Sequence, residues 1–390
     1  GGRRSSSSST PTAGRPKERA EVQSMFVLAP IAAVLALSSG PWGAGLAQEA
    51  RVAVQVVQWA MQLCQALACD MAVVDSSASG KEMDACDVTA GVSFIKAGDS
   101  TPVTAADFAI QGLVSQALCS AFPNDRFMGE EDASDLRDDA DLRALALRLC
   151  SSYGGEDDEA AFLESVDRGL EPPRGTGERV WILDPIDGTK GFMTGEGYVI
   201  GLALVDADGD ALIGVMGVPT EAEAPPIMAA VKGHGLRWWP AVGDAPLEYT
   251  PPRPAWADGG EALPPWLISP QKSFGACQPF GAGHAPTVVC CGAMIKYYYT
   301  AAGRAAGFIQ YEESLKSWDH ACGLICVQES GGRATDAEGA RVLFPGRTFR
   351  VQGGIVCASR WATTEHVEKL MQAASGCFVE GEYAAAQEFF

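Results

Sequence analysis

Apolar residues recur at helical spacing in two segments of the first third of the chain. The segment 51–72 repeats them at Val52, Val56, Val57, Met61 and Leu67. The segment 104–122 repeats them at Ala106, Ile110, Leu113, Val114, Ala117, Leu118 and Ala121. Because an α-helix has 3.6 residues per turn, this spacing gathers the apolar side chains on one face. The pattern predicts two helices ahead of the main run of strands.

Short, nearly continuous apolar runs come next and are typical of buried strands. The first covers 180–183, and four more cover 198–205, 211–218, 227–231 and 236–239. Turn sequences such as Asp208-Gly209 and Gly233-His234-Gly235 separate them. Strands joined by such tight turns pair antiparallel, so the series predicts a meander.

The second half of the chain alternates between the two patterns. Strand-like runs at 265–269, near Phe308 and at 354–358 flank predicted helices at 293–302 and after Trp318. This alternation is typical of an α/β domain. Prolines crowd the segment 251–265, as in a junction. We therefore predict an N-terminal α+β domain over 50–250 and a C-terminal α/β domain over 251–390.

Residues 1–49 differ from the rest and predict a targeting leader outside the fold. They are rich in arginine and serine and poor in acids, and an apolar stretch follows at 26–37. That stretch is shorter than the roughly 20 residues of a membrane span, so we expect no membrane association. The composition indicates an organelle. We favour a plastid, with a mitochondrion or the cytoplasm as alternatives, and a secretory signal remains open.

Composition limits the partners. The chain has 390 residues, 47% of them hydrophobic, and a formal net charge of −20. The apolar content is sufficient for packed cores. The negative charge argues against nucleic-acid polymers, which are bound by basic surfaces. The twelve cysteines show no paired Cys-x-x-Cys, so we expect mostly reduced core thiols, with a regulatory disulfide as the alternative.

The sequence Asp-Pro-Ile-Asp-Gly-Thr at 184–189 is the strongest chemical signal. It places Asp184 and Asp187 directly after the apolar run 180–183. Pro185 cannot donate a ladder hydrogen bond, so we expect the strand to end there and present both acids. Carboxylate oxygens are the ligands that Mg²⁺ prefers. Taken alone, the motif also fits an ordinary Asp-Gly loop before a helix.

Three further acidic sites each have an ordinary interpretation as well. Asp107 follows Thr104 at the spacing of a capping box, so it is either a helix cap or a site residue. Glu130 lies in a run of acids, 130–132, that also fits a solvated loop. Asp319 falls in the predicted first turn of a helix that ends at Gly331-Gly332, where it would complement the helix dipole.

Taken together, these motifs resemble one family. The chain is similar to the magnesium-dependent, lithium-sensitive phosphatases that include inositol monophosphatases and 3′(2′),5′-bisphosphate nucleotidases. The matching motifs are Thr101-Pro102-Val103-Thr104 with Asp107, Gly129-Glu130-Glu131, the segment 184–189, and Trp318-Asp319-x-Ala321-x-Gly323. Lys190-Gly191-Phe192 and the insertion between Glu131 and Val180 resemble the nucleotidase branch, above all its plant and algal organellar members.

The resemblance implies a fold, a cofactor and roles for the acids. The implied fold is a layered αβαβα sandwich. The implied cofactor is Mg²⁺, two or three ions per site, held by Glu130, Asp184, the carbonyl of Ile186, Asp187 and Asp319. Asp107 and Thr189 would orient and deprotonate a metal-activated water, without a phosphoenzyme. The backbone N–H groups of Gly188 and Thr189 would hold the phosphate, with Asp319 also at the substrate.

The implied substrate is a small phosphorylated nucleotide. Lys296 matches a lysine that contacts the second phosphate of adenosine 3′,5′-bisphosphate in the family. Ala293 and Gln310 depart from the serine and arginine expected of nucleotidases. An inositol phosphate or inositol polyphosphate 1-phosphatase is therefore the alternative enzyme, and a non-catalytic sensor of phosphonucleotides is the alternative of another class. We expect a monomer with its site between the domains.

Competing chemistries find little support in the sequence. The four histidines show no zinc spacing, and no triphosphate-binding loop or nucleophile elbow occurs. Trp238-Trp239 and the three tyrosines 297–299 invite a base-stacking hypothesis, although the tryptophans fit a strand end against the core better.

Overall fold

The fold is seen in a computed structural model of the chain. It describes residues 42, 45–77, 93–95, 102–170, 178–258, 265–269, 286–310, 314–351 and 354–379. Nearly all of the predicted leader lies outside these residues. Trp42 belongs to the described part and is buried, with its ring stacked on that of Trp239 at 5.6 Å between centroids. Packing thus begins within the segment that we assigned to the leader.

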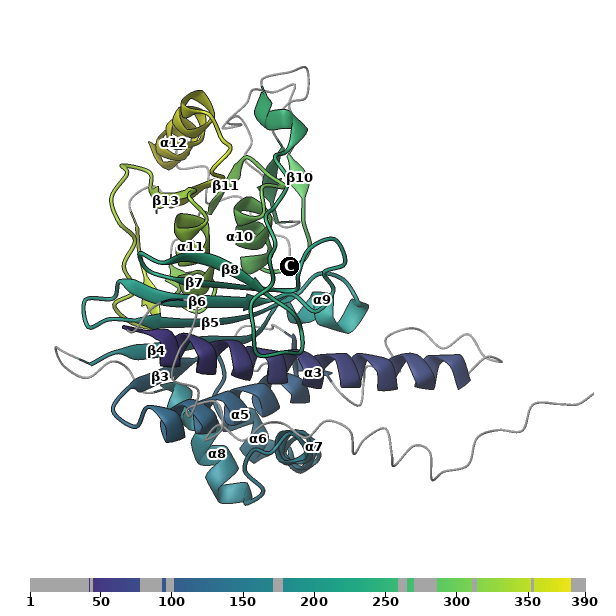
Figure 1. Cartoon of the computed structure of the whole chain (residues 1–390). Coiled ribbons are helices and arrows are strands. Elements are labelled where there is room, and N and C mark those ends of the chain that lie inside the picture. Colours follow the sequence, from purple (N-terminus) through teal and green to yellow (C-terminus); the bar gives the residue numbers. More distant parts are fainter. Residues whose placement is uncertain are drawn as a thin grey trace, which may run out of the picture.

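A six-stranded sheet forms the centre of the molecule (Figure 1). Its second strand, β4, pairs parallel with β3 and antiparallel with β5, and each later strand pairs antiparallel with the one before it. This confirms the predicted meander, including the turn at Gly233, which has a φ of +75°. The strands in order are β3 (Arg126–Gly129), β4 (Val180–Asp187), β5 (Val199–Val205), β6 (Ala211–Gly217), β7 (Ile227–Val231) and β8 (Gly235–Trp239).

Helices cover one face of this sheet. The two predicted helices, α3 (Ala47–Ser77) and α5 (Ala105–Ala121), are both present and both contact it. The insertion after Glu131 folds into a further helical layer, which packs on α5 (Figure 1). Its members are α6 (Ser134–Asp138), α7 (Ala140–Ser152), α8 (Glu159–Asp167) and the short 3₁₀ helix η1 (Arg168–Leu170).

A second, five-stranded sheet lies above the first in Figure 1, with α10 (Met294–Ala301) and α11 (Ala321–Glu329) between them. Helix α12 (Thr364–Val379) packs on the far side of the second sheet. The layers therefore run helix, sheet, helix, sheet, helix, which confirms the predicted αβαβα sandwich. The strands in spatial order are β10 (Thr287–Val288), β9 (Trp266–Ile268), β11 (Gly307–Gln310), β15 (Ile355–Ala358) and β13 (Arg333–Asp336).

Smaller elements complete the described chain. Two two-stranded sheets pair β1 (Ser93–Ile95) with β2 (Pro102–Thr104), and β12 (Leu315–Lys316) with β14 (Thr348–Phe349). Helix α9 (Thr189–Thr194) follows β4, and the 3₁₀ helix η2 (Ala255–Asp258) lies in the proline-rich segment. Among the described helices, none is both long enough and apolar enough to cross a membrane.

One hydrophobic cluster joins the two sheets. It combines apolar side chains of β4 to β7 with those of α10, α11, β11 and β15. A second cluster packs α3 and α5 on the other face of the central sheet. Because α10 and α11 bury apolar surface against both sheets, they fix how the sheets lie relative to each other. The domain boundary near 251–265 stays a prediction.

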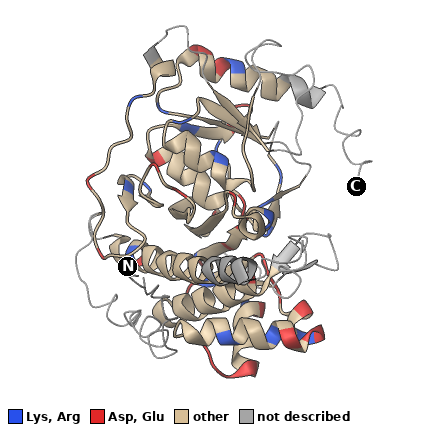
Figure 2. Ribbon diagram, turned by 90° about the vertical axis from the view of Figure 1, so that its right-hand side faces the viewer, with Lys and Arg blue, Asp and Glu red and all other residues tan. Residues whose placement is uncertain are grey.

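Acidic side chains are concentrated in the outer helical layer. Figure 2 shows red residues gathered on the helices farthest from the second sheet, where α6, α7 and α8 lie. Lysine and arginine are spread over the rest of the ribbon without forming a basic stripe in this view.

Candidate active site

The end of β4 brings two carboxylates together through an irregular backbone. Contrary to our expectation, the strand does not end at Pro185 but continues to Asp187. The three steps from Asp184 to Asp187 lie opposite only two steps of β5, from Gly201 to Val199. In a regular strand, residues three apart point to opposite faces. The extra residue, a β-bulge around Pro185, lets Asp184 and Asp187 serve one site.

Asp187 is held from across the site by the start of α10. The backbone N–H of Ala293 donates to its Oδ1 at 2.9 Å, and that of Met294 donates to its Oδ2 at 2.6 Å. Gly292 makes this approach possible: its φ is +86°, and a Cβ there would lie 2.3 Å from the Asp187 carboxylate. Burial raises the pKa of Asp187 to about 6, although these two hydrogen bonds lower it.

Asp184 lies at the centre of the acids. It is buried, and its Oδ1 accepts a hydrogen bond of 3.0 Å from the backbone of Ile186. Burial raises its pKa well above the ordinary value, and the negative charges of the four other predicted acids raise it further; in order of effect these are Glu130, Asp187, Asp319 and Asp107. The structure therefore brings all five acids into one electrostatic neighbourhood.

Three of these carboxylates are close enough to share a cation. One oxygen each of Asp184, Asp187 and Asp319 lies within 4.8 Å of the other two. Asp319 comes from the turn between β12 and α11; the helix begins at Ala321, so Asp319 precedes the first turn in which we expected it. Its position confirms that acids 132 residues or more apart in the sequence meet at one place.

Glu130 approaches from β3. Its backbone N–H donates to the carbonyl of Leu183 at 3.2 Å, which continues the parallel pairing of β3 with β4. The next residue, Glu131, is fixed by the buried side chain of Gln111 on α5, which accepts from its N–H at 2.9 Å and donates to its carbonyl at 2.6 Å. We did not predict a role for Gln111; a polar residue within the apolar helix was the available signal.

Asp107 has the structural role that we kept open for it. Its Oδ2 accepts hydrogen bonds from the backbone N–H and the hydroxyl of Thr104, at 2.8 and 2.7 Å, within a capping box. Although Asp107 caps the helix, it also lies near the other acids, because its charge contributes to the raised pKa of Asp184. Thr189 lies at the start of α9, where its hydroxyl donates to the Ile186 carbonyl at 3.2 Å.

Lys296 is the one buried lysine in the described part of the chain. Its Nζ lies 2.5 Å from Ser269 Oγ and 3.3 Å from the Gly292 carbonyl. Its charge lowers the pKa of Asp187. Its Nζ also lies 5.9 Å from the centroid of the Phe308 ring.

The neighbouring aromatic residues are occupied by the core. Tyr297 and Tyr298 are buried, and their hydroxyls contact His320 Nδ1 and the Pro225 carbonyl, both at 2.9 Å. The base-stacking hypothesis is therefore wrong for these two tyrosines. Trp238 and Trp239 are also buried, as the strand-end interpretation predicted.

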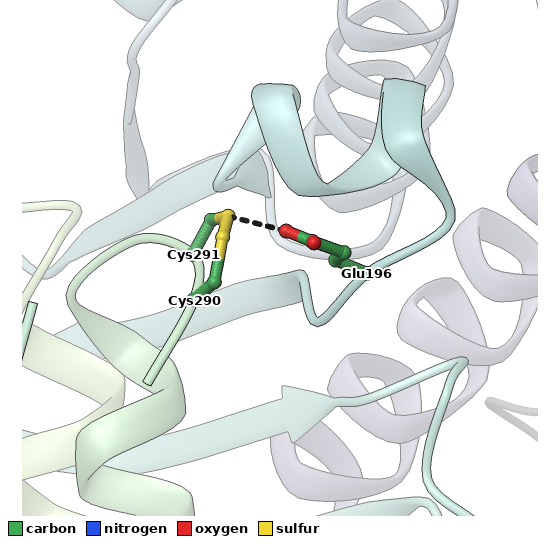
Figure 3. A group of neighbouring side chains, drawn as sticks. All are labelled: Glu196, Cys290 and Cys291. Carbon is green, nitrogen blue, oxygen red and sulfur yellow. Dashed lines mark hydrogen bonds between the residues drawn. A yellow bond between two sulfur atoms is a disulfide. The ribbon is translucent and has the colours of Figure 1, made fainter. Parts of the chain in front are cut away.

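Cysteines 290 and 291 lie beside the site. Figure 3 shows the two sulfur atoms joined in a disulfide, with Cys291 Sγ pointing towards Glu196 Oε2 at 3.6 Å. Sulfur atoms in a disulfide are not thiolates, so in this form the group offers no soft metal site. The other cysteines described are free, and all but Cys119 are buried, as expected of core thiols.

Comparison with known proteins identifies the group to which the chain is similar. A family model described as "Inositol monophosphatase family" matches residues 49–375. A putative mitochondrial 3′(2′),5′-bisphosphate nucleotidase of Arabidopsis thaliana is 30% identical over 76% of this chain and 78% of its own length. A 3′(2′),5′-bisphosphate nucleotidase of Emericella nidulans is 31% identical over 67% and 85%.

Solved structures agree at the level of fold. An IMPase of Thermotoga maritima superimposes with a TM-score of 0.51 at 18% identity, over 83% of this chain and 97% of that one. Inositol monophosphatase II of Staphylococcus aureus gives 0.50 at 16% identity, over 88% and 100%. The family match covers every acid of the cluster and the fold is shared, so this chain belongs to the inositol monophosphatase family.

Proposed function

We propose that the protein is a Mg²⁺-dependent phosphatase that removes the 3′-phosphate of adenosine 3′,5′-bisphosphate to give AMP and phosphate. The observation that carries the proposal is the cluster of Asp184, Asp187 and Asp319 within 4.8 Å. Relatives named 3′(2′),5′-bisphosphate nucleotidase supply the substrate class. The nucleotidase is preferred to an inositol phosphatase on that basis.

The donor set fits hard divalent cations. Two like charges about 5 Å apart repel by roughly 3 kcal/mol at an effective dielectric near 20. Burial raises the pKa of Asp184, and repulsion from the neighbouring acids raises it further, so without a cation this carboxyl tends to bind a proton. The residues that would hold Mg²⁺, two or three ions, are Glu130, Asp184, the Ile186 carbonyl, Asp187 and Asp319. When bound, Mg²⁺ supplies charge neutralisation and Lewis acidity.

Two residues of the chain are assigned to proton transfer and positioning. Asp107, held by Thr104, and Thr189, held by the Ile186 carbonyl, would orient the attacking water and accept its proton. The backbone N–H groups of Gly188 and Thr189 would hold the phosphate, and the φ of +87° at Gly188 shapes that turn. The bond from phosphorus to the water oxygen forms as the bond to O3′ breaks, and O3′ takes a proton.

Recognition of the second phosphate is assigned to Lys296. Its burial and its hydrogen bond to Ser269 fix the ammonium group near the acids. A bisphosphate presents a second dianion to it, whereas an inositol monophosphate does not. Gln310, where an arginine was expected, is buried on β11 and carries no charge to assist. Lys296 therefore becomes the main determinant of preference for bisphosphates.

A substrate panel tests the proposal. With purified protein and Mg²⁺, release of inorganic phosphate is compared for adenosine 3′,5′-bisphosphate, its sulfated analogue, 5′-AMP and inositol 1-phosphate at equal concentrations. We expect the highest kcat/KM for adenosine 3′,5′-bisphosphate. A higher value for inositol 1-phosphate would favour the inositol phosphatase. Binding without any turnover would favour the phosphonucleotide sensor.

Replacing Lys296 should change substrate preference more than catalysis. In Lys296→Gln the polar side chain keeps a partner for Ser269 but loses the charge. We expect KM for adenosine 3′,5′-bisphosphate to rise by about tenfold or more, since hydrogen bonds to charged groups contribute about 1.5–3 kcal/mol. The KM for inositol 1-phosphate should change little. Equal losses for both substrates in steady-state kinetics would contradict this role.

An organelle is the compartment that we propose. The Arabidopsis thaliana relative is named as mitochondrial, and residues 1–49 have the composition of a targeting segment. The preference for a plastid, sensitivity to lithium and the monomeric state stay predictions.

A further inference from the structure

Arg347 connects the segments that carry Glu130 and Asp319 without belonging to the acids. One guanidinium nitrogen donates to the carbonyls of Gly129 and Gly169 at 2.7 and 2.6 Å, and another donates to the carbonyl of Glu130 at 3.2 Å. These carbonyls belong to the end of β3 and to η1. The backbone on both sides of the Glu130 side chain is thereby attached to one side chain from the other half of the molecule.

The same residue also holds the turn before α11. The guanidinium carbon lies 4.6 Å from the centroid of the Trp318 ring. The Arg347 carbonyl accepts a hydrogen bond of 2.9 Å from the N–H of Ser317, and the Ser317 hydroxyl donates to the Gly346 carbonyl. The pairing of β12 with β14 continues these contacts. Asp319 follows directly after Trp318, so its backbone position depends on this arrangement.

We propose that Arg347 is a positioning residue that sets the separation between Glu130 and Asp319, and through it the affinity of the cluster for divalent cations. This inference rests on the proposed metal site. Arginine suits the task because its planar guanidinium offers five donors and an aromatic-stacking face. A lysine offers one rotating ammonium group, which cannot bond three carbonyls and stack on Trp318 together.

Arg304 provides a matched control. Its guanidinium also lies over an aromatic ring, that of Tyr299 at 5.2 Å, and it donates two hydrogen bonds to Glu221 at 2.9 and 2.7 Å. Both arginines are half-buried. The contacts of Arg304 do not include any acid of the cluster or the segments that carry them. If weaker Mn²⁺ binding resulted only from lower stability of the fold, substitution of either arginine should therefore weaken it to the same extent.

The test compares Arg347→Lys and Arg304→Lys with the wild type. Binding of Mn²⁺, as a probe of the divalent site, is measured by isothermal titration calorimetry without substrate, and thermal unfolding is followed with and without Mn²⁺. We expect R347K to bind Mn²⁺ about 10- to 100-fold more weakly, the range for partners that orient metal ligands. R304K should bind as the wild type does. The activity of R347K should be closer to that of the wild type at saturating Mg²⁺ than at low Mg²⁺.

The possible results separate the two proposals. Unchanged Mn²⁺ affinity in R347K, or an equal loss in R304K, would overturn the positioning role while the phosphatase assignment stands. A wild-type protein that binds no Mn²⁺ would overturn the proposed function and this inference together.

Discussion

Asp184→Asn should abolish turnover of adenosine 3′,5′-bisphosphate. Asparagine has nearly the shape of aspartate, but it lacks the charge and turns one acceptor oxygen into a donor. Asp184 is buried, lies within 4.8 Å of Asp187 and Asp319, and has a pKa raised by burial first and then by the neighbouring acids. Loss of a partner that only orients a ligand costs about 10- to 100-fold. Loss of the central ligand itself should therefore lower kcat/KM by more than about a hundredfold, measured as phosphate release with Mg²⁺.

Stability measurements separate this loss from misfolding. In the metal-free protein, burial and the neighbouring like charges make the ionised form of Asp184 unfavourable. Asparagine is neutral, so D184N should melt at the same or a higher temperature in EDTA. Mg²⁺ should raise the melting temperature of the wild type but not of the variant.

Asp336→Asn is the matched control for this experiment. Asp336 is also a buried aspartate, but it lies on β13, where its Oδ1 accepts hydrogen bonds from Glu338 and Ala340 within a turn. Asparagine keeps an acceptor there, so turnover should stay near the wild-type rate. Turnover by D184N at that rate would remove Asp184, and with it the proposed metal centre, from the mechanism.

The periodicity of apolar residues in the sequence was sufficient to predict most of the central sheet and the helices α3 and α5 that cover it. Tight glycine turns specify the pairing of β5 with β6 and of β7 with β8, because strands joined by such turns pair with each other. The longer, glycine-free segment 218–226 joins β6 to β7. Helical spacing likewise located α3 and α5. The meeting of Asp184 with Asp319 followed from the family resemblance, since apolar periodicity alone does not say which strand end faces which helix.

Several features of the site depend on contacts that no local pattern encodes. The β-bulge between Asp184 and Asp187 appears only when β5 is paired with β4. The hydrogen bonds from Ala293 and Met294 to Asp187 join residues more than 100 positions apart. Neither bond depends on the identity of the donor side chain, because both donors are backbone groups. Of these features, only the positive φ of residue 292 restricts the sequence, because that backbone conformation favours glycine.

Outlying elements were missed for a different reason. The strand β13, Arg333–Asp336, carries alternating polar and small residues and has no apolar run to reveal it. It is defined by its pairing with β15. The insertion helices α6 and α8 are short and rich in acids, a composition that also fits a solvated loop. Helix α7 was not predicted either, although its leucines Leu142, Leu145 and Leu149 recur at helical spacing. Helices α7 and α8 pack on α5 and have aspartate caps, Asp139 and Asp158, whereas α6 packs on α7.

The metal-free protein should lose stability as the pH rises through about 6. Burial raises the pKa of Asp187 from 3.8 to about 6, and the pKa of Asp184 is raised as well. The folded state therefore binds these protons more tightly than the unfolded chain does. Their stabilisation is complete below the unfolded pKa near 4 and is lost as the pH passes the folded value. For Asp187 the pKa difference corresponds to about 3 kcal/mol of unfolding free energy.

Denaturant unfolding in EDTA between pH 5 and 7.5 measures this loss directly. Mg²⁺ should reverse the trend, because cations replace the protons: stability should recover at pH 7.5, and the apparent Mg²⁺ affinity should fall as the pH drops below 6. Stability in EDTA that instead rises steadily from pH 5 to 7.5 would mean that the acids are ionised and compensated within the protein itself. The carboxylates would then have no need of cations, and the reason for placing metal ions among them would disappear.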